Sequence, residues 1–320
     1  MSVTAPAQAL GPIYLRLVGV AALWGGTFIA TRVLARMMPH LTAATLRFVV
    51  AVALLLVVAK RMGGLPRLTR AQAASTFVLG FTGAFLYNVC FFGALELLPA
   101  SRTALIVALN PIVTALVMAM VLRERIAAIR WIGIGVALVG SVVIITRGDL
   151  GAALSQSVGR GELLMFGGVC AWAAYTIIGQ YALRELSPVA ATTYASMWGG
   201  LMLAIGALFE LREVDPGALG WQAIAGIVYL GAFGTVIAFV WYYQAVQAIG
   251  PARTAVFNNL VPVFAVTFGV LLLGEQLLPS MLIGGAMVIA GVMLTNRRGK
   301  SAAPRTAHER SATGESGAAP

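Results

Sequence analysis

Charged residues are scarce in this chain, and acidic residues are the scarcest of them. Of 320 residues, 22 are Lys or Arg, 11 are Asp or Glu and 60% are hydrophobic, with a mean hydropathy of +0.90. Soluble proteins carry about 25% charged residues, so this composition excludes an ordinary soluble domain. In water, so much apolar surface would leave large exposed patches, whereas a lipid bilayer covers it.

Histidine and cysteine are also nearly absent. The histidines, His40 and His308, fall outside the long apolar runs, and Cys90 and Cys170 fall inside them. No Ser–His pair or His/Glu cluster is therefore available at membrane depth, and no disulfide framework is indicated. No phosphate-binding loop of the form G-x-x-x-x-G-K-[ST] occurs. We expect no catalytic residues, no metal, no cofactor and no ATP motor.

The apolar residues are arranged in runs long enough to cross a bilayer, which takes about 20 residues in a helix. The runs do not alternate as barrel strands do, so the sequence predicts an all-α membrane protein of ten transmembrane helices. The predicted spans are residues 13–34, 42–59, 73–95, 101–122, 130–146, 161–181, 189–209, 220–243, 252–273 and 279–296.

The basic residues lie in short clusters between these runs, as in membrane loops, and not on a face that would bind nucleic acid. With the N-terminus inside, 15 Lys and Arg residues fall in cytoplasmic segments and 6 on the opposite side. This bias predicts that both termini are cytoplasmic.

A gapless internal repeat runs through the chain, because residues 80–148 and 231–299 align at a constant offset of 151 positions. Rare Arg, Pro and Glu residues are matched, as well as Gly. The matched pairs are Gly80 and Gly231, Gly83 and Gly234, Arg102 and Arg253, Pro111 and Pro262, Glu124 and Glu275, Gly133 and Gly284, Gly140 and Gly291, and Arg147 and Arg298. In the front part of each half Trp24 aligns with Trp172.

Ten spans divide into two halves of five, and an odd number inserts the second half upside down. We therefore expect two inverted five-helix repeats, the usual construction of a secondary transporter with its site between the halves. The expected organisation is a short cytoplasmic N-terminus (1–12), two repeats (13–148 and 160–298) and a disordered cytoplasmic tail (299–320).

Polar backbone at mid-membrane marks the first candidate site. Pro111 and Pro262 lie near the middle of spans four and nine, where proline removes a backbone hydrogen bond and bends the helix. Exposed backbone at this depth is tolerated where it lines water or is buried in protein. Three side-chain amides add to these kinks: Asn110, Asn258 and Asn259. We expect them to line a central cavity; the alternative is that neighbouring helices satisfy them.

Aromatic residues with polar tips supply the second candidate feature, because they offer apolar area together with a hydrogen bond. The candidates for solute binding are Trp24, Tyr87 with its neighbour Asn88, Trp172, Tyr175 and Tyr243. For Trp241 and Tyr242, a place in an interfacial aromatic belt fits as well as a place in the pore.

Ionisable residues within the spans are few. Arg47 lies several residues into span two, where it could bind a carboxylate or snorkel to the interface. Glu124 and Glu275 end spans four and nine, which suits helix-end or gate contacts. No Asp or Glu falls at the middle of a span, so facilitated diffusion or exchange fits better than proton antiport.

The order of these motifs resembles the EamA-type branch of the drug/metabolite transporter superfamily. The motifs are a Trp-containing first span (ALWGGTF at 22–28), Leu46-Arg47-Phe48 in span two, a mid-span Pro in span four, and a Glu-bearing turn after it. The turn reads Leu122-Arg123-Glu124-Arg125 in one half and Leu273-Gly274-Glu275-Gln276 in the other. The second half departs from the pattern, with Ser196 and Met197 in place of the Arg-Phe pair.

The resemblance covers about residues 13–298. It implies a bacterial inner-membrane carrier that exports amino acids, related metabolites or drugs, with spans one, three, six and eight lining the pore. Fold alone does not determine the substrate. A multidrug or aromatic-cation efflux carrier and a lipid-carrier flippase stay open as alternatives, and so does a homodimer.

Overall fold

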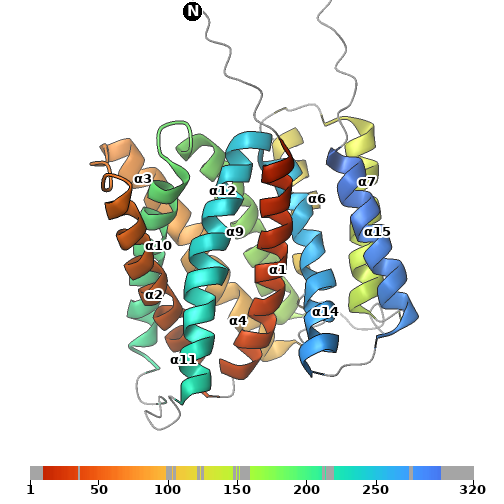
Figure 1. Ribbon diagram of the computed structural model, residues 1–320, viewed down its shortest axis with the longest axis horizontal. Coiled ribbons are helices and arrows are strands. Elements are labelled where there is room, and N and C mark those ends of the chain that lie inside the picture. The colour runs from red at the N-terminus through yellow and green to blue at the C-terminus, as the bar shows by residue number, and fades with distance from the viewer. Residues whose placement is uncertain are drawn as a thin grey trace, which may run out of the picture.

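A computed structural model describes residues 10–34, 37–98, 103, 106–120, 123, 126–146, 149, 151, 159–210, 213, 220–273 and 277–296. Within these ranges the regular structure is entirely helical (Figure 1). Glu124 and Glu275, the two predicted gate residues, lie outside the described ranges.

The first half contains five helical crossings, of which the third has a π-helical middle. They are α1 (Leu10–Leu34), α2 (His40–Arg61), the run α3–η1–α4 (Arg70–Leu79, Gly80–Leu86, Tyr87–Leu97), α6 (Asn110–Met120) and α7 (Ala128–Ile145). The second half repeats the order. Its crossings are α9 (Arg160–Ala182), α10 (Pro188–Ala207), the run α11–η4–α12 (Trp221–Val228, Tyr229–Ile237, Ala238–Ile249), the run α13–η5–α14 (Pro251–Ala255, Val256–Leu260, Val261–Leu273) and α15 (Pro279–Asn296).

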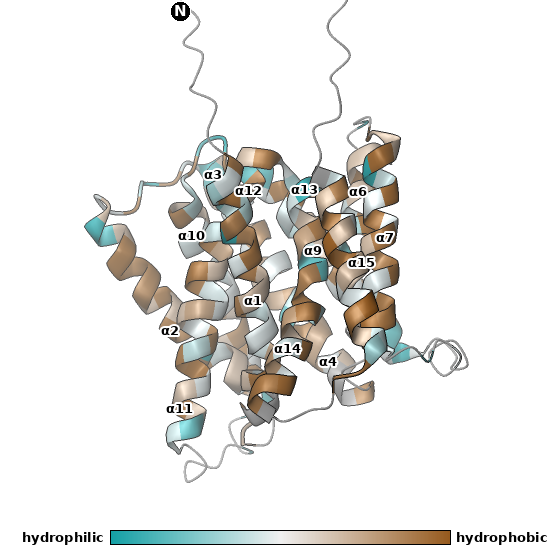
Figure 2. Ribbon diagram, turned by 45° about the vertical axis from the view of Figure 1, so that its right-hand side comes forward, coloured by the Kyte–Doolittle hydropathy of each residue, from teal (hydrophilic) through white to brown (hydrophobic). Residues whose placement is uncertain are grey.

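Eight of these helical runs are long and apolar enough to cross a membrane, and two shorter apolar helices, α6 and α15, complete the ten. Hydrophobic residues follow the helices along their length, and hydrophilic residues gather mostly near their ends (Figure 2). Large apolar side chains such as Leu15, Val57, Leu201 and Leu271 are exposed on the outside, where lipid would cover them. The chain is an all-helical membrane protein, as its composition predicts.

The two halves interlock instead of lying side by side. Helix α1 packs on α12 and α14, and its counterpart α9 packs on α4 and α6. Likewise α2 packs on the π segment η4, and α10 packs on η1. Each helix that opens a repeat therefore packs mainly on helices of the other repeat. Helix α1 begins and α15 ends on the same side of the bundle (Figure 1).

Helices α7 and α15, the last of each repeat, form a tight antiparallel pair at one edge of the bundle (Figure 1). Their contact is built from four glycines that the repeat relates in pairs. A Cβ atom added at Gly140 would lie 2.6 Å from the Gly284 carbonyl oxygen, and one added at Gly291 would lie 2.5 Å from that of Gly133. Small residues allow such close approach in a bilayer, and the crossed pairing is what an inverted repeat produces.

The π-helical segments η1 and η4 stand at matched places in the two halves. Gly80 and Gly83 of η1 correspond to Gly231 and Gly234 of η4 at the 151-residue offset. A Cβ at Gly80 would lie 2.5 Å from the Ala195 carbonyl oxygen on α10, and one at Gly231 would lie 2.8 Å from Val50 on α2. These glycines let the π segments lie directly on the second helix of the opposite repeat. Wide π turns often mark functional sites. The sequence showed the matched glycines as part of the repeat but did not predict the π turns.

The glycine contact between α7 and α15 predicts a position-specific loss of stability. Gly140→Ala should destabilise the protein by about 1–3 kcal/mol, because its methyl group meets backbone that cannot move aside. Gly135→Ala is the matched control on the same helix, since nothing lies within 4 Å of a Cβ added there. The control should gain up to about 1 kcal/mol from helix propensity. Thermal unfolding of the two purified variants checks this; equal melting temperatures would contradict it.

Candidate functional site

A cluster of aromatic rings occupies the centre of the bundle, where α1, α9 and α12 meet. The Trp24 and Trp172 ring centroids are 5.3 Å apart and edge to face, at 81°. The Tyr242 ring lies 5.4 Å from Trp24 and 5.6 Å from Trp172. Phe239 closes the cluster, and Tyr87 of α4 joins it at 5.2 Å from Trp172. The two repeat-related tryptophans, both predicted from the sequence, thus touch at the interface between the halves.

The tyrosines extend this cluster toward the side of the bundle where α9 ends. Tyr175 and Tyr243 stack at 4.8 Å, and both are almost fully buried. The Tyr243 hydroxyl donates to the Tyr175 carbonyl, and the hydroxyls of Tyr242 and Thr176 lie 3.0 Å apart. Tyr242 is 1% exposed, so its interpretation as an interfacial belt residue is wrong. Its side chain packs inward because the α12 face that carries it contacts α1 and α9.

The predicted helix kinks coincide with breaks in helical structure. A new helix begins at Asn110, just before Pro111, and a 3-10 segment, η5, precedes Val261 and Pro262. Helix α6 packs on α9, α13 and η5, so both breaks lie beside the aromatic cluster. Helix α1 of the first repeat also approaches α14 closely, because residue 25 is glycine. A Cβ atom added at Gly25 would lie 2.7 Å from the Phe264 Cβ on α14.

Asn110 and Asn259 are buried at these breaks, and part of their hydrogen-bonding capacity is unused, whereas Asn258 is half-buried. Among the residues that the structure describes, Oδ1 of Asn110 and both amide atoms of Asn259 have no hydrogen-bond partner. The same holds for Oγ1 of Thr114, one turn beyond Asn110. Asn258 lies near the Tyr242 hydroxyl. Buried groups of this kind cost free energy, so a functional site has a use for them where a plain core does not.

Asn88, also predicted to bind solute, behaves differently. Its amide donates to the Ala84 carbonyl one turn earlier in the same helical run. Its hydrogen bond therefore supports the end of η1 locally.

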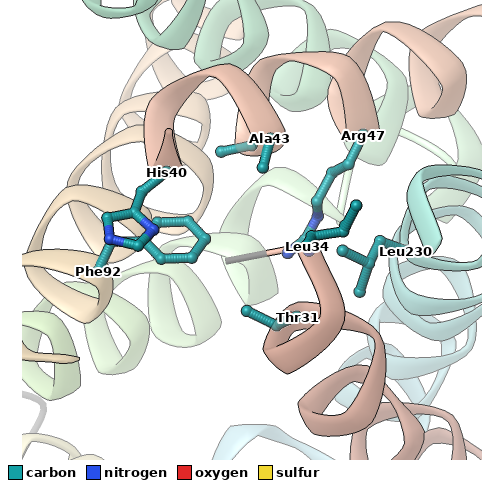
Figure 3. A pocket seen from close by; sticks show the side chains of 8 residues that line it. Thr31, Leu34, His40, Ala43, Arg47, Phe92 and Leu230 are labelled. Atoms are coloured by element: carbon teal, nitrogen blue, oxygen red, sulfur yellow. The ribbon is translucent and has the colours of Figure 1, made fainter. Parts of the chain in front are cut away.

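Arg47 lies on the wall of a small pocket (Figure 3), and its charge interacts with Tyr87, the member of the aromatic cluster on α4. The pocket is lined by residues of α1, α2, α4 and η4: Thr31, Leu34, His40, Ala43, Ala44, Arg47, Phe92 and Leu230. Nε of Arg47 donates to Oγ1 of Thr235 at 3.2 Å, and Thr235 donates to the Leu230 carbonyl. Arg47 is thus attached to the π segment of the other repeat, a contact that the sequence did not reveal.

The comparisons with known proteins agree with this architecture. The EamA-like transporter family model matches residues 11–146 and again 159–297. The chain belongs to the EamA-like transporter family. It is therefore a membrane transporter with an internal repeat, and not an enzyme.

Two relatives and one solved structure are similar to this EamA-like chain over most of its length. It is 29% identical to "Uncharacterized transporter YyaM" of Bacillus subtilis, over 88% of this chain and 92% of the relative. It is 31% identical to "Probable terminal-alkyne amino-acid exporter" of Streptantibioticus cattleyicolor, over 68% of this chain and 71% of that protein. A solved crystal structure superimposes with a TM-score of 0.73 at 18% identity, covering 90% of this chain and 98% of that one.

The unused amides predict a separation of stability from activity. Asn259→Leu removes two buried polar atoms without partners, so the melting temperature should stay level or rise while transport is lost. Asn88→Leu is the control, because it breaks a made hydrogen bond and should lower the melting temperature. Thermal unfolding and solute counterflow measure the two effects. Full transport by Asn259→Leu, or its failure to fold, would contradict a role in binding.

Proposed function

We propose that this chain is a secondary carrier of the bacterial inner membrane that exports a small organic solute, an amino acid or related metabolite, by alternating access. Both termini are cytoplasmic in this proposal, on the distribution of 15 against 6 basic residues. The exporter named among its relatives supports an amino-acid-like solute.

One asymmetry between the halves carries the proposal. Nε1 of Trp24 donates to the Gly234 carbonyl of η4 at 3.0 Å. The repeat relates Trp24 to Trp172 and Gly234 to Gly83, so an exact copy of the contact would join Trp172 to the Gly83 carbonyl of η1. Instead, Nε1 of Trp172 is buried beside the Tyr242 hydroxyl and makes no hydrogen bond of good geometry to a described residue. The two repeat-related indoles therefore differ, because only that of Trp24 is hydrogen-bonded to the π segment of the opposite repeat.

The residues around these indoles match as well. Tyr175 lies over Gly83, in the place that Thr27 takes over Gly234. At Gly234 the contact with Thr27 leaves room for the Trp24 bond, whereas the Tyr175 ring covers Gly83. An inverted repeat can reach a second arrangement in which the halves exchange conformations. In that arrangement Trp172 binds Gly83 and Trp24 releases Gly234, which opens the site to the other side.

The central site suits a small solute better than a drug. Its aromatic rings pack directly on one another, and the unused groups of Asn110, Asn259, Trp172 and Tyr175 lie around them. A partly apolar solute with a few hydrogen-bonding groups would insert between these rings and satisfy those groups. A multidrug carrier or a flippase would need a wider opening toward the lipid.

Transport assays in proteoliposomes test the carrier. A labelled amino acid should enter with saturable kinetics and show counterflow, in which unlabelled solute trapped inside accelerates uptake. Uptake that rises without saturation would identify a channel, and movement of labelled lipid alone would identify a flippase. Either result would reject the proposal.

The tryptophan asymmetry predicts different consequences for two matched variants. Trp24→Phe removes a formed hydrogen bond, so amide hydrogen exchange should increase in 229–237. Trp172→Phe removes none in this state, so exchange in 80–86 should stay unchanged. Both should slow counterflow about two- to tenfold, because a bond worth about 0.5–1.5 kcal/mol is lost from one of the two states. Equal exchange in both variants, or full counterflow in Trp172→Phe, would contradict the exchange of conformations.

A further inference from the structure

A short basic hairpin joins α2 to α3, on the side of the bundle where α1 begins (Figure 1). We call residues 60–70 the basic hairpin, because four of these eleven residues are cations and none is acidic. The four cations are all exposed: Lys60, Arg61, Arg67 and Arg70. None of their side chains has a hydrogen bond or ion pair with another residue that the structure describes. The hairpin therefore presents four positive charges that the described part of the protein leaves unpaired.

Backbone contacts hold the basic hairpin in one conformation. Gly64 has the left-handed φ of 92° that favours glycine, and its amide donates to the Ala59 carbonyl at 2.8 Å, which closes the end of α2. At the other end, a capping box at Thr69 starts α3. Between them, the Tyr194 hydroxyl of α10 donates to the Pro66 carbonyl at 2.7 Å. The charges are therefore carried by a fixed loop that is attached to both repeats.

The cations stand at the ends of two lipid-facing stripes. Side chains four and seven residues apart share one face of a helix. On α2 the exposed side chains of Val49 and Leu56 therefore lie in line with Lys60, and on α3 the exposed ring of Phe77 lies in line with Arg70. Figure 2 shows the hydrophobic body of α2 ending in hydrophilic residues on this side. Since lipid tails cover the apolar part of each stripe, the cations at its end lie at the level of the lipid headgroups.

Helix stability does not account for the cation at the start of α3. The first turn of a helix carries a positive partial charge, which favours acidic side chains and disfavours cations. Helix α3 nevertheless begins at Arg70 and has no acidic residue in its first turn. A carboxylate does lie near this helix start, that of Glu185 in the turn after α9, but it accepts from the Gln72 amide at 3.0 Å. An anion from outside the protein would therefore stabilise this end of α3.

We propose that the basic hairpin binds the phosphate groups of anionic phospholipids. Clusters of Lys and Arg next to a membrane helix attract such lipids, because the headgroup phosphates lie at the same depth as the cations. Met62, which is 66% exposed in the same loop, adds apolar area for the acyl chains. This interaction is with the bilayer and is separate from the binding of a transported solute. Because Tyr194 attaches the hairpin to α10, a bound lipid stabilises the packing of the first repeat on the second.

Thermal-shift titrations of the full-length protein in neutral detergent micelles test this surface, since a ligand that favours the folded form raises its melting temperature. The probes are dioctanoyl phosphatidylglycerol and dioctanoyl phosphatidylcholine, which share their acyl chains and differ in net charge. Phosphatidylglycerol should raise the melting temperature saturably, and phosphatidylcholine should not. The rise should shrink when the ionic strength is increased from about 0.1 M to about 1 M, because the Debye length falls from about 10 Å to about 3 Å.

Charge-matched double variants assign the effect to the hairpin. Two variants each replace two of the four cations by glutamine: Lys60→Gln/Arg61→Gln and Arg67→Gln/Arg70→Gln. Each should weaken the binding of phosphatidylglycerol about tenfold. The control, Arg123→Gln/Arg253→Gln, removes the same charge from the same side of the bundle, after α6 and in α13, and should bind like the wild type. Each shift is measured against the same variant without lipid. If one hairpin variant does not fold, the other variant and the comparison of the two lipids on the wild type still decide.

Several outcomes overturn the proposal. They are equal shifts with the two lipids, no shift with phosphatidylglycerol, and unchanged affinity in both hairpin variants. An equal loss of affinity in the control variant would assign the effect to overall positive charge instead of the hairpin. Inorganic phosphate that reproduces the full shift would identify a site for free phosphate and not for lipid. The test is independent of solute transport, because absence of saturable counterflow in the wild type would reject the carrier without affecting these lipid shifts.

Discussion

The hydrocarbon core of a bilayer offers no hydrogen-bond partners, and this constraint governs the polar contacts inside the bundle. A donor or acceptor within the spans that has no partner in the protein raises the free energy of the folded state, so such a group is expected mainly where function requires it. Most of the described side-chain hydroxyls obey the rule locally: Thr82, Ser141 and Thr295 each donate to a carbonyl one turn earlier. Exceptions among the described residues include Trp172, Tyr175, Asn110 and Asn259 at the centre of the bundle, and also Thr114 on α6, Thr45 on α2 and Thr192 on α10. We infer that solute or water completes these groups during the transport cycle.

The same constraint explains why the helical breaks stand where they do. Proline at 111 and 262 removes a backbone donor, and the π segments displace carbonyls from their usual partners. Free backbone groups in lipid would be prohibitive, but these lie against helices of the opposite repeat. The Trp24 indole meets one such carbonyl at Gly234, and Thr235 meets another at Leu230. Irregular backbone and the interface between the halves are therefore the same region of the molecule.

The halves share a plan and differ in detail, and the differences fall at the proposed site. Thr27 stands where the other half has Tyr175, and Arg47 stands where it has Ser196. The ring of Tyr175 therefore has no counterpart in the first half, and the Arg47 cation has no counterpart in the second. Duplication supplies two interchangeable conformations, whereas divergence makes the two faces chemically unequal.

Much of this could be predicted from the sequence, because composition and spacing act through local physics. The ten apolar runs, the repeat, the kinks at Pro111 and Pro262 and the pairing of Trp24 with Trp172 depend on helix length, hydropathy and residue chemistry alone. Tertiary packing decided the rest. It turned Tyr242 inward, used the Asn88 amide within its own helix and joined Arg47 to Thr235, 188 residues away. It also gave the Trp24 indole a hydrogen bond to the Gly234 carbonyl and gave the Trp172 indole no corresponding bond. No local pattern encodes such choices, because they depend on which distant backbone group a side chain meets when two inverted halves interlock.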